Sequence, residues 1–305
     1  MYLGAHLGIS GGLGDAVREA RKIGCESLQI FSKSPQMWSG PPIAPAAAEE
    51  FRAAVVAEGI RATAVHHAYL ANLASPKPFM LKRSRTAFLD EVRRADLLGV
   101  DGLIFHPGAH LGSGPEAGLR TIAESLRFIL DELPESRVRL LLENAAGQGT
   151  TLGSRFEELA SVLAQVDRPD RLGVTLDTCH LFAAGFDFRE ESGYGNLVDQ
   201  VERILGTATV RAFHLNDAKE ELGSHLDRHE NIGKGKIGVQ GFGHLVNDHR
   251  WDATPGYLET PIDDRGYARY AEDLTTLRSL LTAAPVPSPG RKPARRAAAR
   301  PSTPK

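Results

Sequence analysis

The stretch GVTLDTCHLF, residues 173–182, points both to the fold and to a site. Its first half, around Val174 and Leu176, is apolar and β-branched, as expected of a strand that is buried on both faces. The strand then ends in Asp177, and His180 follows three residues later. A buried ionised carboxylate is costly unless another group compensates it. The rest of the chain is therefore expected to supply partners for Asp177.

Short apolar runs alternate with longer amphipathic segments on both sides of this stretch. In residues 155–166, apolar side chains recur three and four positions apart, which is the spacing of one helix face. Similar helical patterns occupy residues 88–99, 119–130 and 269–281. The apolar runs predict eight strands, at residues 2–7, 27–31, 62–66, 102–106, 139–143, 173–177, 210–214 and 256–259.

Eight strand–helix units in one pass predict a single (β/α)₈ TIM barrel over residues 1–284. A doubly wound open sheet is the alternative, and it normally needs a glycine-rich phosphate turn after its first strand. Gly11 and Gly12 follow the first strand without a G-x-G-x-x-G pattern. The barrel is therefore favoured.

The last residues, 285–305, differ in composition from the rest of the chain. They hold six Lys or Arg and no acid, are rich in Pro and Ala, and lack apolar periodicity. A disordered basic tail is predicted, either an anchor for polyanions or a solubilising segment. Residues 1–284 then carry 30 basic and 38 acidic side chains, a net charge of −8.

Composition argues against a membrane-spanning, a secreted or a disulfide-stabilised protein. With 42% hydrophobic and 24% charged residues, the chain is typical of globular domains. No apolar run approaches the ~20 residues that span a membrane, and the first residues lack the pattern of a signal peptide. Cys25 and Cys179 are the only cysteines, too few for a disulfide framework. We therefore expect a protein of a reducing cytoplasm with no membrane partner.

Six of the eight predicted strands end in a histidine or a carboxylate. All strands of a barrel deliver their carboxyl ends to one face, with neighbours about 4.8 Å apart, so these side chains should converge. Any one of them alone is more often a packing or loop residue than a ligand, but six together favour a shared site. They are His66, His106, Glu143, Asp177, His214 and Glu259.

Three loop residues complete this set: His180, Asp227 and His229. Five histidines and four carboxylates without a thiolate suit zinc or manganese better than calcium or magnesium. Since a catalytic zinc takes about three protein ligands, nine residues predict three metal ions, two of them joined by a bridging carboxylate. Of the other histidines, His6 is expected behind this site and His67 facing away from it.

Longer motifs contain these residues: GAHLGISGGL, NLAS, FHPGAHLG, LLLENAAGQG, LGVTLDTCHLFAAGFD, HLNDAKEELGSHLDRHENIGKGKIG and GYLETP. In these motifs the chain resembles the endonuclease IV family of apurinic/apyrimidinic endonucleases, over about residues 2–281. That family has a (β/α)₈ barrel with a trinuclear zinc site. The resemblance therefore agrees with the fold and metal count inferred from the residues.

The resemblance also implies which residues share each ion, with manganese as an alternative to zinc at one position. His66, His106 and Glu143 would hold the first zinc. Glu143 would bridge to the second, which Asp177, His214 and Glu259 complete. The third zinc would lie between His180, Asp227 and His229.

The implied reaction is hydrolysis of the DNA phosphodiester 5′ to an abasic site, which leaves a 3′-hydroxyl and a 5′-deoxyribose phosphate. A zinc-activated hydroxide would attack, with Glu143 as the catalytic residue that orients it. An additional 3′-end-cleaning phosphodiesterase activity is implied. The expected partner is double-stranded DNA with abasic sites or blocked 3′ ends, bound by a monomer.

Four residues are expected to contact DNA. Tyr69 and Leu70 follow His66 and suit a wedge that fills the gap left by a missing base. Gln36, where some relatives carry Arg, and Arg228 are the other two. Three zinc ions would bring the barrel from −8 to about −2, with the positive charge in the cleft. Basic loop residues could add phosphate contacts: Lys33, Lys82, Arg83, Arg85, Arg228, Lys234 and Lys236.

Two other functions are alternatives. A sugar isomerase or epimerase on the same barrel holds one or two metals with fewer ligands, and has no use for the Asp227–His229 pair. A protein that binds DNA lesions without cleaving them should have lost ligands, yet all nine are present. The nuclease is therefore the favoured function.

Overall fold

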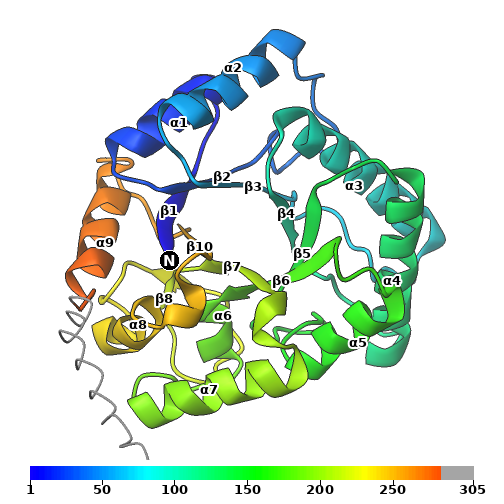
Figure 1. The fold of residues 1–305 in the computed structure, drawn as a ribbon. Helices are drawn as coiled ribbons and strands as arrows, with labels where there is room; N and C mark the ends of the chain where they lie inside the picture. Colours follow the sequence, from blue (N-terminus) through cyan, green and yellow to red (C-terminus); the bar gives the residue numbers. More distant parts are fainter. Residues whose placement is uncertain (283–305) are drawn as a thin grey trace, which may run out of the picture.

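Eight parallel strands close into a barrel in the computed structural model, which describes residues 1–282 (Figure 1). The TIM-barrel prediction is confirmed, and β10 closes the ring by pairing with both β1 and β7. The predicted tail, 285–305, lies outside the described residues. The barrel strands are β1 (Tyr2–Leu7), β2 (Ser27–Ile30), β3 (Ala62–His66), β4 (Gly102–Phe105), β5 (Arg139–Glu143), β6 (Leu172–Asp177), β7 (Val210–His214) and β10 (Pro255–Leu258).

Helices form a ring outside the strands (Figure 1). Each of the longer ones buries the apolar stripe that its sequence spacing predicts; α4, for example, buries Leu119, Ile122, Leu126 and Ile129. The helices are α1 (Leu13–Lys22), α2 (Pro45–Ala57), α3 (Pro78–Leu98), α4 (Pro115–Glu132), α5 (Phe156–Val166), α6 (Thr178–Ala183), α7 (Glu191–Ile204), α8 (Gly238–Val246) and α9 (Ala268–Ser279). Across residues 1–282, none is long and apolar enough to cross a membrane.

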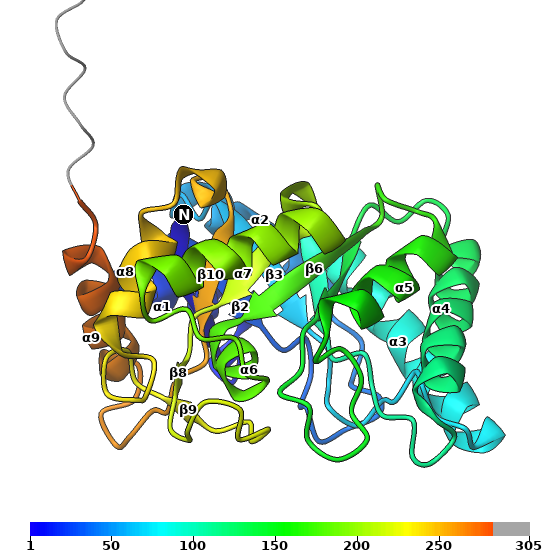
Figure 2. The same ribbon diagram turned by 90° about the horizontal axis from the view of Figure 1, so that it is seen from below.

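A small antiparallel sheet lies beyond the barrel and was not predicted. It pairs β8 (Asp217–Ala218) with β9 (His229–Glu230) and closes the long loop after β7. Figure 2 shows this sheet among the loops at the end of the barrel opposite the N-terminus. Because β1 starts at the N-terminus and all barrel strands are parallel, that end is the carboxyl-terminal face, where barrel sites lie.

The barrel interior separates this face from the amino-terminal one. A compact layer of five buried side chains fills it: Ala64, Ile104, Leu141, Ala212 and Tyr257. A larger apolar core lies between the strands and the surrounding helices. Polar groups at the two ends of the barrel are thereby kept apart.

Candidate metal centre

All nine predicted ligand residues lie at the carboxyl-terminal end of the barrel. Three of the side-chain groups that could hold a metal ion include all nine, and two of these groups share Glu143. Within a group, one nitrogen or oxygen atom of each side chain lies within 4.8 Å of those of the others. These are the sets that the resemblance implied, although their role as ligands stays a prediction. The groups are His66–His106–Glu143, Glu143–Asp177–His214–Glu259 and His180–Asp227–His229.

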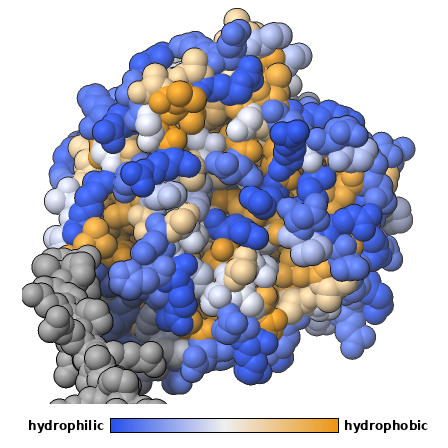
Figure 3. Space-filling model, in the orientation of Figure 1, coloured by the Kyte–Doolittle hydropathy of each residue, from blue (hydrophilic) through white to orange (hydrophobic). Residues whose placement is uncertain are grey.

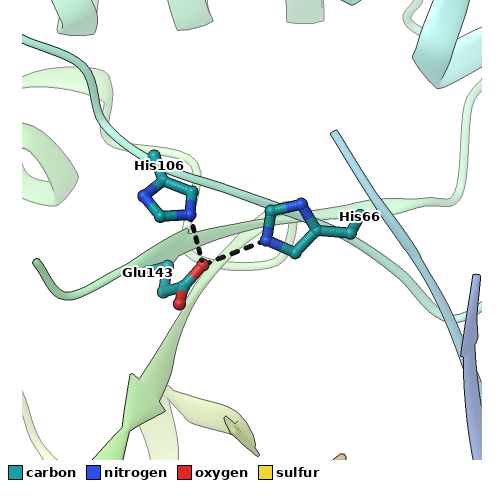
Figure 4. Close-up of side chains that lie close together, drawn as sticks. All are labelled: His66, His106 and Glu143. Atoms are coloured by element: carbon teal, nitrogen blue, oxygen red, sulfur yellow. Dashed lines mark hydrogen bonds and ion pairs between the residues drawn. The ribbon is translucent and has the colours of Figure 1, made fainter. Parts of the chain in front are cut away.

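Glu143, at the end of β5, is fully buried and shared by the first two groups. Its Oε2 lies 3.1 Å from His66 Nε2 and 3.4 Å from His106 Nε2 (Figure 4). Its Oε1 lies 2.9 Å from His214 Nδ1. Burial alone would raise the pKa of Glu143, but the surrounding imidazoles hold it well below its usual value. The carboxylate is therefore ionised and presents an oxygen to each group.

The buried carboxylate of Asp177, at the end of β6, has the partners that the sequence led us to expect. It caps α6, and its Oδ1 accepts a hydrogen bond from the backbone N–H of His180 at 2.8 Å. Its Oδ2 accepts from Asn216 Nδ2 at 2.7 Å, and its own N–H donates to Asn144 Oδ1 at 2.6 Å. The Asp-x-x-His spacing is thus the first turn of a helix and also brings both side chains to the centre.

Backbone carbonyls fix the orientation of three of the histidine rings. A carbonyl only accepts, so each Nδ1 facing one carries the proton, and in the neutral ring Nε2 is left with a lone pair. In each case that Nε2 faces a carboxylate of the centre. The Nδ1–carbonyl pairs are His66 with His67 at 2.8 Å, His180 with Asn144 at 2.8 Å and His229 with Glu259 at 3.1 Å.

The third group shows what this orientation demands. Asp227 Oδ2 lies 3.1 Å from His180 Nε2, and Oδ1 lies 3.0 Å from His229 Nε2. Lone pairs that face each other at this distance repel unless a proton or a metal cation lies between them. Burial lowers the pKa of His229, but the contact with Asp227 and the charge of Asp177 raise it to about 9. The third group, His180–Asp227–His229, therefore favours a proton or a metal cation between its side chains.

This donor set fits zinc: imidazole nitrogens oriented by backbone carbonyls, ionised carboxylates and no thiolate. Cys179 also lies near Asp177 and His229. However, its Sγ is 3.5 Å from the carbonyl of Arg228, and burial raises its pKa far above the usual range. Cys179 is therefore a packed neutral thiol.

Gln29 and His6 surround the outer carboxylate, Glu259. As expected, His6 lies behind the centre, with Nδ1 2.9 Å from Glu259 Oε1. Gln29 Nε2 donates to the same oxygen at 2.6 Å, and Gln29 Oε1 accepts from His214 Nε2 at 2.9 Å. Gln29 was missed, although a polar residue inside the apolar strand 27–31 was a usable signal. His67 faces away, as predicted, and its ring stacks on Phe88 at 4.7 Å.

Two buried carboxylates that sequence reasoning also missed hold the loop that carries Asp227 and His229. Asp273 on α9 accepts from the backbone N–H of Ile232 at 3.1 Å and from Asn231 Nδ2 at 2.9 Å. Asp217, in β8, gathers further backbone amides of the same loop. The donors to Asp217 are the N–H groups of Gly233, Gly235 and Ile237, at 2.9, 3.1 and 2.9 Å.

The predicted DNA-contacting residues lie on exposed loops. Tyr69 and Leu70 are 60% and 39% exposed, and the Tyr69 ring centroid is 5.5 Å from that of His66. Gln36 is exposed in the loop between β2 and α2. Arg228 is exposed, and its Nη1 donates to the carbonyl of Asp227 at 2.6 Å. Tyr69 and Arg228 thus adjoin the centre, and all four contacts with DNA stay predictions.

Lys33 departs from the expectation for the basic loop residues. It is buried and forms an ion pair with Glu91 of α3, so it is not exposed to contact phosphate. Burial lowers the pKa of Lys33 to about 8. Arg94, also on α3, donates to the carbonyls of Ser32 at 2.5 Å and Pro41 at 2.9 Å. These contacts anchor both ends of the loop that carries Gln36.

The closed barrel and its buried cluster of histidines and carboxylates can be compared with known protein families. Residues 17–280 match the sequence model of the xylose isomerase-like TIM barrel family. Solved structures of sugar epimerases share this fold. One example is D-psicose 3-epimerase from Clostridium cellulolyticum, which is 18% identical with a TM-score of 0.68 and covers 93% of this chain and 100% of that one. This likeness concerns the fold alone.

Closer relatives narrow the class. The chain is 42% identical over 281 residues to a probable endonuclease 4 of Chloroflexus aurantiacus, covering 92% of this chain and 98% of the relative. It is 41% identical to a probable endonuclease 4 of Geobacter sulfurreducens, covering 92% and 94%. The crystal structure of endonuclease IV from Thermus thermophilus is 35% identical with a TM-score of 0.81, covering 92% and 98%. This protein belongs to the endonuclease IV family.

Proposed function

We propose that this protein is a DNA-repair nuclease that hydrolyses the phosphodiester 5′ to an abasic site and leaves a 3′-hydroxyl and a 5′-deoxyribose phosphate. Family membership supports the coarser assignment, an endonuclease that acts on damaged DNA. The observation that carries the finer proposal is the set of three ligand groups, two of which share Glu143. Cleaning of blocked 3′ ends by the same centre is part of the proposal.

Three zinc ions are proposed to occupy the three groups, with manganese as an alternative at one of them. When bound, zinc supplies a Lewis acid that polarises phosphoryl oxygens and lowers the pKa of water. Each group offers three or four donors, which matches zinc coordination that leaves a position open for substrate. The buried free thiols Cys25 and Cys179 are compatible with a reducing bacterial cytosol as the proposed location.

Glu143 is proposed to orient the attacking water. Its carboxylate lies between the first two groups and is held ionised, so it can accept a hydrogen bond but cannot donate one. The imidazoles of His66 and His214 flank it on either side and keep it in place. Because this orientation exists before substrate binds, the reaction needs little rearrangement of the charged groups.

The exposed loops are proposed to recognise the lesion in duplex DNA, with the protein acting as a monomer. Tyr69 and Leu70 present an aromatic and an aliphatic side chain beside the first group, where they can fill the space of a missing base. A cavity of about 300 Å³ adjoins Tyr69 and His106 and offers room for the sugar without its base. Gln36 and Arg228 are proposed to contact the DNA on either side.

The test is cleavage of an end-labelled duplex with a single abasic site, with an intact duplex of the same sequence as control. We expect a single nick 5′ to the lesion, with a 3′-hydroxyl that a polymerase extends. Prolonged chelation should remove this activity, and zinc should restore it. Absence of a nick from protein shown to hold three zinc ions would contradict the proposed function.

A further inference from the structure

The amino-terminal end of the barrel contains a recess that the proposed nuclease function does not use. The recess has a volume of about 230 Å³ and lies where β3, β5 and β7 begin. Figure 3 looks onto this face and shows hydrophilic residues beside hydrophobic ones around the barrel axis. Three arginines line the recess: Arg61, Arg139 and Arg211.

Small side chains on the strands create this space. TIM barrels usually fill their interior with layers of bulky branched residues. Here β3 contributes Ala62 and Ala64, β4 contributes Gly102 and β7 contributes Ala212. The buried side chain of Tyr257 also lines the recess and belongs to the layer that fills the middle of the barrel. The recess is therefore separated from the metal centre by packed side chains.

All three arginines are exposed, so water reaches their guanidinium groups. Among residues 1–282, none of them forms a hydrogen bond or an ion pair with a protein group. The recess also contains Asp101, but its Oδ2 accepts hydrogen bonds from Thr63, at 2.8 Å from the backbone N and 3.5 Å from Oγ1. Three cations therefore share the recess with one carboxylate, which leaves an excess of positive charge.

Two of the arginines are positioned by contacts with an aromatic ring and with a backbone segment. The guanidinium carbon of Arg61 lies 5.0 Å from the centroid of the Tyr2 ring, in a cation–π contact. The aliphatic part of Arg211 packs against Gly173, where an added Cβ would lie 2.6 Å from Arg211 Cγ. These contacts position the arginines but leave their N–H groups free. The electrostatic repulsion among these like charges decreases when an anion binds.

We propose that this recess binds a compact phosphate anion, either free phosphate or the terminal phosphate of a nucleotide. The planar fork of a guanidinium matches two phosphate oxygens, so three arginines can engage one multiply charged group. The volume is below the ~300 Å³ at which pockets for drug-sized ligands begin, which suits a phosphate and excludes a complete nucleotide from the interior. The proposal does not depend on the nuclease function.

The test is equilibrium dialysis of zinc-loaded protein against orthophosphate and, separately, ADP, at constant ionic strength in chloride. The recess variant is Arg61→Gln/Arg139→Gln/Arg211→Gln. The control, Arg21→Gln/Arg93→Gln/Arg203→Gln, removes the same charge from exposed arginines outside the recess. Phosphate bound at the metal centre is common to all three proteins and cancels from the comparison.

We expect wild type and control to bind one more equivalent of orthophosphate or ADP than the recess variant. Tighter binding of ADP identifies a nucleotide as the source, and equal or tighter binding of orthophosphate identifies free phosphate. Equal stoichiometry in all three proteins would overturn the proposal. If the triple variant does not fold, Arg139→Gln alone carries the test, since this side chain is exposed at the start of β5. It should weaken binding about tenfold.

Discussion

The charged groups at the two ends of this barrel have opposite signs and different surroundings. At the carboxyl-terminal end, Glu143 and Asp177 are fully buried and surrounded by imidazoles and amides that fix each oxygen. At the amino-terminal end, Arg61, Arg139 and Arg211 line an open recess, and their guanidinium groups form no hydrogen bond or ion pair with residues 1–282. The side chains at one end are thus arranged so that they could hold cations, and we propose that the arginines at the other end bind an anion. The same strands support both because a packed layer lies between them.

The largest effect should follow removal of metal from the carboxyl-terminal end. Chelation should lower the rate of cleavage at an abasic site by about 10³-fold or more, since the Lewis acid is lost. It should also lower the melting temperature, because ions that bind only the folded state stabilise it by about 4 kcal/mol at a thousandfold excess over Kd. Full turnover by protein with no measurable zinc would contradict the metal centre.

Glu143→Gln should have the next largest effect. The substitution keeps the shape of the side chain but removes the charge shared by two groups, and we expect cleavage to fall by about 10³-fold, or ~4 kcal/mol. The circular dichroism spectrum should be unchanged. Glu116→Gln, at an exposed position on α4, is the matched control and should cleave like wild type. Activity of E143Q within tenfold of wild type would show that Glu143 is not central.

Asp217→Asn tests the support of the third group. The amide nitrogen replaces an acceptor oxygen with a donor that faces backbone N–H groups, so the loop bearing Asp227 and His229 should loosen. We expect zinc content to fall from three ions towards two and activity to fall about 10–100-fold. Asp248→Asn, whose carboxylate contacts Tyr194 and Arg250, is the control and should keep all three ions. Normal zinc content in D217N would show that the third group does not depend on Asp217.

Tyr69→Ala should weaken recognition of the lesion and leave the metal centre intact. Because an aromatic–base stacking contact is worth about 1–3 kcal/mol, KM for the abasic duplex should rise about tenfold or more with zinc content unchanged. Phe128→Ala removes a partly exposed aromatic from α4 and should leave KM unaltered. An unchanged KM in Y69A would remove Tyr69 from the DNA interface.

The smallest effect is expected at the amino-terminal end. Arg139→Gln should cleave abasic DNA within about twofold of wild type, because distant sites that share no partners act independently. Steady-state rates for the two proteins at saturating DNA are the measurement. A larger loss of cleavage would show that the two ends are coupled through the barrel.

The sequence was informative where structure follows from periodicity. His66, His106, Glu143 and Asp177 end or follow strands that an apolar pattern defines, and barrel geometry then brings the strand ends together. The composition of the set indicated the metal class before any geometry was known. The barrel and the convergence of the nine residues could therefore be predicted.

Residues whose surroundings depend on tertiary contacts could not be predicted. Asp217 lies in a strand of two residues, too short to show a pattern, and its partners come from a glycine-rich loop. Lys33 looked like an exposed loop residue because its ion-pair partner, Glu91, is 58 residues further along the chain. In both cases the deciding neighbour is distant in sequence, and no local signal identifies it.

The most direct test of the central claim, a trinuclear centre built from nine residues, is a zinc-edge anomalous diffraction map of the holoenzyme. The account predicts three peaks, one in each ligand group, with Glu143 between the first two. A single peak, or no peak between His180, Asp227 and His229, would contradict it.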